Sequence, residues 1–277
     1  MAINRTGYAW VVLVAGLIAS LGLYVLVRDR VESEARLRFE NDAADAARKI
    51  EDRVRSYADV LYSVRGLFDS DAKVTRRQFH DYVASLNLGA RYPGFQIINF
   101  EEYVTAGRKA AFEAAVRRDT SLNGRGYPDF RIRPPGERPV YFVLNYVEPM
   151  QGNEGVFGAD ISTNNQGRNL AGLDRMRGFN QLSSSGRLVR IDGPERYVAL
   201  SIRLPVYRAG APTGSEAERR DAYIGSVGAG FRVKESLAPI IASSIPKAIA
   251  FQLYNIGPAG TVPSPDKLVA DNLLYGE

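Results

Sequence analysis

Arginine, tyrosine and serine side chains recur within otherwise apolar stretches of the C-terminal half. Of the residue patterns in the chain, this one could most readily form a binding site. Pockets that bind small molecules are mainly apolar and carry a few oriented polar groups. Arg203 lies between Ile202 and Leu204, and a buried arginine can hold a carboxylate through two hydrogen bonds. An outward strand position facing solvent fits the same spacing, so both placements stay open. The pattern indicates ligand binding, with the candidate residues Tyr146, Phe157, Ser183, Arg190, Arg203 and Tyr207.

Residues for catalysis or metal binding form no recognisable pattern. His80 is the only histidine, and it follows Phe79 in a predicted helix. A catalytic histidine needs a hydroxyl nucleophile and a carboxylate, and no GxSxG-type turn supplies them. The absence of cysteine removes disulfides, thiolate metal sites and cysteine nucleophiles. We expect no catalysis, metal or cofactor, and interpret His80 as a surface or partly packed residue.

The charge of the chain does not indicate nucleic-acid binding. The net charge is +5 and the isoelectric point is near 9.4. The arginines are scattered among acids, which is typical of a solvated helix face. The glycines of GSVGAG at 225–230 lack the spacing of a dinucleotide-binding loop, and they indicate close packing within a strand.

The stretch from Pro139 to Gly178 organises the predicted fold. It reads as a strand at 140–147, a polar turn at 150–154 and a second strand at 156–161. A helix then begins near Ser162 or Thr163 and ends at Gly178.

The N-terminal part reads as a membrane anchor followed by a long helix. Residues 8–27 carry no charge and are long enough to cross a bilayer. A cleaved signal peptide is the alternative, but its apolar core would be shorter and a cleavage site would follow. Residues 28–72 form a predicted stalk helix, with apolar residues at threes and fours from Phe39 to Phe68. A stalk that dimerises and a lone helix lying along its own domain remain open.

The rest of the chain predicts an α+β domain at 73–277. The capping box at Thr75 and Gln78 begins a short helix. The residues 208–221 between two strands read as an exposed loop. Two successive groups of helix followed by antiparallel strands favour a PAS-like sensor fold, with two PAS-like subdomains. The remaining elements are a strand at 95–100, a helix at 107–118, strands at 188–191, 197–207 and 223–233, a helix at 235–244 and a strand at 248–256.

An ordered set of residues from about 73 to 256 resembles the CHASE domain, a sensory module of bacterial receptors and plant cytokinin receptors. The set comprises YFVLNYVEP, Asn153, GADIS at 158–162, Arg168, RMRG at 175–178, LPVYR at 204–208 and YIGSVGAGFRV at 223–233. The resemblance implies a single-pass protein of the bacterial inner membrane. Residues 1–7 would then be cytoplasmic and the domain periplasmic, with Arg168 among the ligand-binding residues.

The resemblance also indicates which ligand to expect. Cytokinin receptors carry an aspartate where Gly167 stands, and threonines at the positions of Ser183 and Arg203. These differences favour an anionic ligand, and we expect no tight binding of cytokinins.

In the family, a second span and a histidine kinase or diguanylate cyclase output follow the domain. Because this chain ends at Glu277 without a second apolar span, we expect signalling through a partner or an output outside it. The expected function is a membrane-anchored sensor, a homodimer through the stalk. The alternative is an anchored protein-interaction or dimerisation module without a small ligand. A hydrolase dependent on His80 is the least favoured hypothesis.

Overall fold

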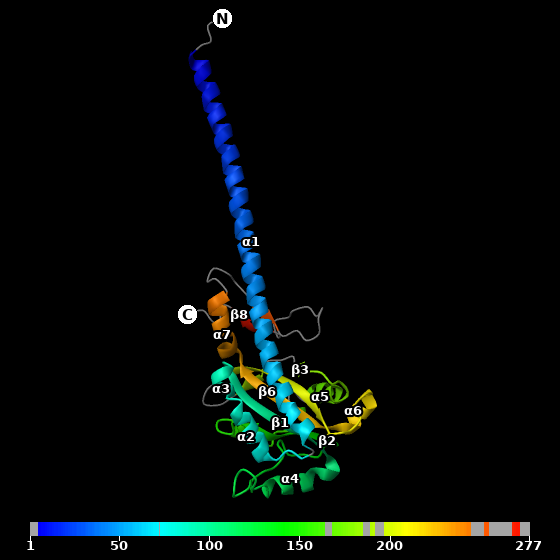
Figure 1. The fold of residues 1–277 in the computed structure, drawn as a ribbon. Coiled ribbons are helices and arrows are strands. Elements are labelled where there is room, and N and C mark those ends of the chain that lie inside the picture. Colours follow the sequence, from blue (N-terminus) through cyan, green and yellow to red (C-terminus); the bar gives the residue numbers. More distant parts are fainter. Residues whose placement is uncertain are drawn as a thin grey trace. The chain divides into compact units, whose positions relative to one another are not determined.

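The computed structural model describes residues 5–71, 73–163, 168–184, 189–191, 197–244, 252–254 and 268–271 (Figure 1). The chain divides into two compact units. One contains residues 1–50 and 240–248, and the other contains residues 51–239 and 249–277. The second unit holds the sheets and every site residue discussed below.

Helix α1 runs without interruption from Arg5 to Ser70, so the predicted span and stalk are one helix. Its N-terminal part is apolar and long enough to cross a membrane, with a mean hydropathy of 2.5 over 18 residues. Farther along, exposed ion pairs one turn apart confirm the solvated face predicted from the charge pattern, among them Arg36–Glu40 and Arg55–Glu51.

Six of the described strands form one antiparallel sheet in the order β2-β1-β6-β5-β3, with β4 also paired to β5. The two strand groups expected from the sequence meet in this sheet, because β1 pairs with β6. The described part also contains a two-stranded sheet, β7-β8. The strands are β1 (Phe95–Thr105), β2 (Val140–Glu148), β3 (Ser183–Ser184), β4 (Val189–Ile191), β5 (Tyr197–Tyr207), β6 (Tyr223–Arg232), β7 (Gln252–Tyr254) and β8 (Leu268–Asp271).

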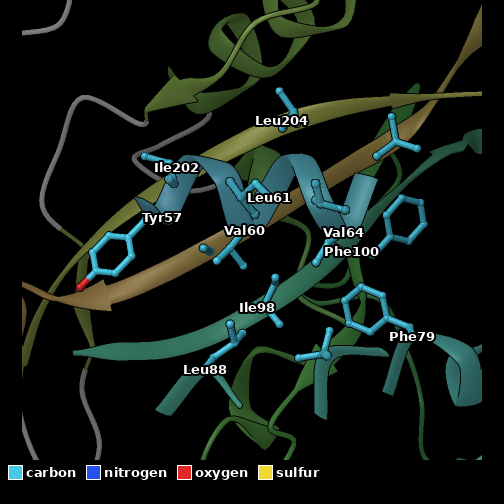
Figure 2. Packing of buried hydrophobic residues seen from close by; sticks show 14 of the residues in the cluster. Tyr57, Val60, Leu61, Val64, Phe79, Leu88, Ile98, Phe100, Ile202 and Leu204 are labelled. Carbon is cyan, nitrogen blue, oxygen red and sulfur yellow. The ribbon is translucent and has the colours of Figure 1, made fainter. Parts of the chain in front are cut away.

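The first face of the main sheet packs against the last turns of α1. Tyr57, Leu61 and Val64 recur at spacings of four and three, and all are buried against the strands (Figure 2). Helices α2 (Arg76–Ser85) and α3 (Leu88–Arg91) complete this core. Both hydrogen bonds of the predicted capping box at Thr75 and Gln78 are present.

The second face packs against α5 (Arg168–Gly178), whose Leu173 and Met176 are buried. The short 3-10 helices η2 (Glu154–Val156) and η3 (Ile161–Thr163) belong to the same layer. Helix α4 (Lys109–Arg117) follows η1 (Ala106–Arg108) and buries Phe112 and Val116 against another small core.

Two predictions of local structure were wrong. Residues 156–161 form no strand. The Asp160 carboxylate accepts hydrogen bonds from the N–H groups of Phe142 and Ser162, and the chain turns into the 3-10 helix η3 at this point. The loop at 208–221 contains helix α6 (Glu216–Ala222), which begins at a capping box of Ser215 and Glu218.

Helix α5 is described from Arg168, so its predicted start lies partly outside the described residues. Helix α7 (Val233–Ser244) lies close to its predicted position.

Candidate functional site

A row of polar and small residues crosses the second face of the main sheet. Cross-strand partners point to the same face of a sheet. The register pairs Ser183 with Arg203, Arg203 with Gly228, and Gly228 with Asn99. In the next row, Ser226 pairs with Glu101. The alternate residues of the same strands, such as Ile202 and Leu204, point to the α1 side.

Arg203 is buried, so it does not take the solvent-facing position that its spacing also allowed. Its Nε donates to Ser226 Oγ at 2.9 Å, and Nη1 and Nη2 donate to Asn99 Oδ1 at 3.1 and 2.8 Å. A Cβ at Gly228 would lie 2.4 Å from Nη1, so the guanidinium would have to shift for any larger residue at this position. Of the five N–H donors of the guanidinium, these bonds use three.

Glu101 is the fully buried acid of this face, and the sequence analysis did not select it. Its Oε2 accepts from Ser226 Oγ at 2.6 Å and from the Tyr223 hydroxyl at 3.0 Å. Its Oε1 has no hydrogen-bond partner within the described structure. Burial raises the pKa of Glu101 to about 7, although the charge of Arg203 opposes this rise. The signal available in the sequence was an acid two residues after Asn99 in an apolar strand.

Helix α5 reaches this network through Arg177. The guanidinium carbon of Arg177 lies 4.2 Å from the ring centre of Tyr103 and 5.7 Å from that of Tyr223. The Tyr207 hydroxyl donates to the Arg177 carbonyl at 3.3 Å. The Arg177 Nε is buried and has no partner in the part of the chain that the structure describes. Tyr207 and Arg177 therefore both lie on this face.

The structure does not bring all seven predicted residues together. Tyr146 and Phe157 lie at the β2 edge, where their rings and that of Tyr127 surround the buried guanidinium of Arg76 at 4.7 to 5.0 Å. Arg76 also donates to the carbonyl and side chain of Asn145, so this aromatic cage is already occupied by a cation of the protein.

Of the other predicted residues, the structure describes the side chain of Ser183 alone. Ser183 is half-buried beside Arg203. Arg168 begins α5 and Arg190 lies in β4, but their side chains lie outside the described residues.

The family model of the CHASE domain matches residues 72–269. The chain belongs to the CHASE domain family. A search of curated proteins found no match. The CHASE domain indicates an extracytoplasmic sensory module rather than a catalytic one, and the apolar part of α1 is consistent with anchoring.

Two residues of the resemblance have structural roles in this CHASE domain. Asp160 of GADIS is buried, accepts three hydrogen bonds at Oδ1 and pairs with Arg138 through Oδ2. Asn153 is buried and donates to the Pro149 carbonyl, which closes the turn after β2. These residues shape the layer that covers the second face.

His80, the residue considered for a hydrolase, lies apart from the network around Arg203. His80 of α2 is partly exposed, and its Nδ1 lies 2.9 Å from Oε1 of Glu148 at the end of β2. Among the described residues, no group of three or more His, Cys, Asp or Glu side chains could hold a metal ion.

Proposed function

We propose that this chain is a membrane-anchored extracytoplasmic sensor that binds a small molecule on the second, α5-covered face of the main sheet. The supporting observation is the buried network of Asn99, Glu101, Arg203 and Ser226, which carries both unused donors and an unused acceptor. Buried polar groups without partners are costly, and a ligand can supply the missing hydrogen bonds.

The opposite face is less suited to a ligand. Tyr57, Leu61 and Val64 of α1 fill it with apolar side chains that are almost inaccessible to solvent (Figure 2). A ligand there would have to displace the helix.

The two faces share their strands, which gives the sensor a route for its signal. In β5, Arg203 points to the α5 side, while its neighbours Ile202 and Leu204 pack with α1 residues in the first core. A ligand that favours one arrangement of β5 will therefore change the packing of α1. The ligand need only bind one arrangement more tightly than another. An α1 anchored in the inner membrane would carry this change to an output or a partner. We propose that the main sheet acts in the manner of a PAS-like sensor.

The proposed ligand-binding residues are Ser183, Arg203 and Tyr207, with Arg168 and Arg190 as further candidates. Gly167 stands where cytokinin receptors carry an aspartate, and Arg203 stands where they carry a threonine, so we propose a small anionic ligand and no tight cytokinin binding. Dimerisation through α1 and a periplasmic location complete the proposal.

A thermal-shift screen of the full-length chain in detergent tests this function. We expect small organic anions to raise the melting temperature and micromolar cytokinins to leave it unchanged. Ser183→Leu, which places a bulky side chain beside Arg203, should abolish the shift. The matched control is Ser184→Leu, because Ser184 is exposed and points to the other face.

One observation favours a second function. Arg203 and Tyr207 already have protein partners, as expected for an anchored interaction module without a small ligand. If no compound of any charge class shifts the melting temperature, this second function replaces the sensor.

A further inference from the structure

The two carboxyl oxygens of Glu101 differ sharply in their surroundings. Oε2 receives two hydrogen bonds, from Tyr223 and from Ser226, whereas Oε1 receives none within the described residues. Since Ser226 accepts from Arg203 Nε, its hydroxyl proton is directed to Glu101. When Glu101 is neutral, its proton therefore lies on Oε1, where it forms a buried O–H donor without an acceptor.

We propose that neutral Glu101 is a ligand contact whose Oε1–H donates a hydrogen bond to the carboxylate of a small organic acid, beside the unused N–H donors of Arg203. This inference rests on the proposed sensor function and names its ligand class and its regulation. The carboxylate supplies the acceptor that the protein lacks, and Glu101 keeps its proton when the anion binds.

The charges around Glu101 favour an anion over a cation. Positive groups on this side are Arg203 of β5 and Arg177 of α5, and Arg203 acts directly on Glu101. The neighbouring acid Glu102 accepts from Asn145 Nδ2 at 2.7 Å, and Asp160, after β2, is paired with Arg138. The titratable and charged groups on this side are Tyr103 of β1, Arg203 and Tyr207 of β5, Tyr223 of β6, Asp174 and Arg177 of α5, and Arg220 of α6. Glu102 follows Glu101 in β1 and acts on it from the other side of the strand.

The proton links ligand binding to pH. Burial holds the pKa of Glu101 at about 7, so the free protein loses this proton as the pH passes through neutrality. A bound carboxylate would face a second negative charge if the proton were lost. Affinity is therefore high below neutral pH and falls above it, which makes the domain responsive to an acid and a proton together.

Binding titrations with defined probes test this inference on the full chain in detergent. The probes are acetate, lactate, succinate and benzoate, with acetamide and methylammonium as neutral and cationic comparisons, each at pH 5.5 and 8.5. We expect at least one carboxylate to bind about tenfold or more tightly at pH 5.5, from the passage of the pH through the pKa of Glu101.

Glu101→Gln should bind that acid with nearly the same affinity at both pH values, because the amide N–H replaces the O–H donor and does not titrate. Glu102→Gln is the matched control and should keep the wild-type pH dependence. The inference is overturned if no carboxylate binds, if binding is independent of pH in the wild type, or if Glu101→Gln retains the full pH dependence. Binding of acetamide or methylammonium alone would overturn it while leaving the sensor function standing.

Discussion

Arg203 and Glu101 show how a guanidinium and an acid whose pKa is raised to about 7 can both be buried in the middle of a sheet. They are bridged by the Ser226 hydroxyl, which accepts from one and donates to the other. Asn99 satisfies the far side of the guanidinium. Because buried charges are stable when paired and hydrogen-bonded, the four side chains depend on one another.

The burial of Glu101 predicts a pH-dependent stability. Its folded pKa of about 7 lies above the ordinary value of 4.5, so the folded state binds the proton more tightly than the unfolded state. This stabilisation is fully present below pH 4.5 and is lost as the pH rises through 7, with a total of about 3 kcal/mol. Chemical unfolding across pH 5 to 8 should show this fall in the wild type and not in Glu101→Gln. Equal slopes for both proteins would refute this assignment.

Gly228 is predicted to be indispensable because the Arg203 guanidinium occupies the space of its missing side chain. Gly228→Ala should lower the free energy of unfolding by about 1–3 kcal/mol, as expected for overpacking. The control is Gly172→Ala in α5, where a Cβ would meet nothing within 4 Å and a helix favours alanine. Denaturant melts measure both, and a harmless Gly228→Ala would show that Arg203 can move aside.

At the level of single residues, the sequence indicated some members of the candidate site and missed others. Arg203 and Tyr207 were selected as candidates because they lie in an apolar stretch, but pairing partners across strands are not visible in a single sequence. Glu101 and Arg177 were therefore missed, since their role depends on the register of β1 with β6 and on the contact of α5 with Tyr103. Tyr146 and Phe157 were selected for their composition, yet they surround Arg76 instead.

At the scale of elements, the last turns of α1 hold the sheet together. Leu61 is fully buried in the core between α1 and the main sheet (Figure 2), whereas the neighbouring Tyr62 is exposed. Leu61→Ala should cost about 2–5 kcal/mol of stability because it leaves a cavity. Tyr62→Ala, the control, should cost about 0.5 kcal/mol or less. Thermal melts of the two variants distinguish them, and similar losses would mean that α1 does not pack as described.

Local sequence rules predicted some helices and strands correctly and missed others. The periodicity of α1 and the capping box of α2 are strong local signals, and both were confirmed. The same capping signal at Ser215 and Glu218 was overlooked because the surrounding residues read as a polar loop. Residues 156–161 have the composition of a strand, but the hydrogen bonds of Asp160 override that preference.

At the scale of the whole molecule, membrane attachment rests on the apolar N-terminal part of α1. We predict that the full chain sediments with membranes and that a chain lacking residues 1–27 is released into the soluble fraction. Transfer of the apolar side chains of a spanning segment from water into the hydrocarbon core of the bilayer is favourable. Recovery of the shortened chain in the membrane fraction would contradict anchoring by this segment.

The central claim is that a small acid binds between the main sheet and α5. Hydrogen–deuterium exchange of the full chain at pH 5.5, with and without saturating amounts of the tightest-binding acid among acetate, lactate, succinate and benzoate, tests it most directly. The account predicts slower exchange of the α5 amides at 170–178 and of η3, because both elements pack in the layer on the face to which Glu101 and Arg203 point. Unchanged exchange there, or slowing confined to α1 and α4, would contradict it.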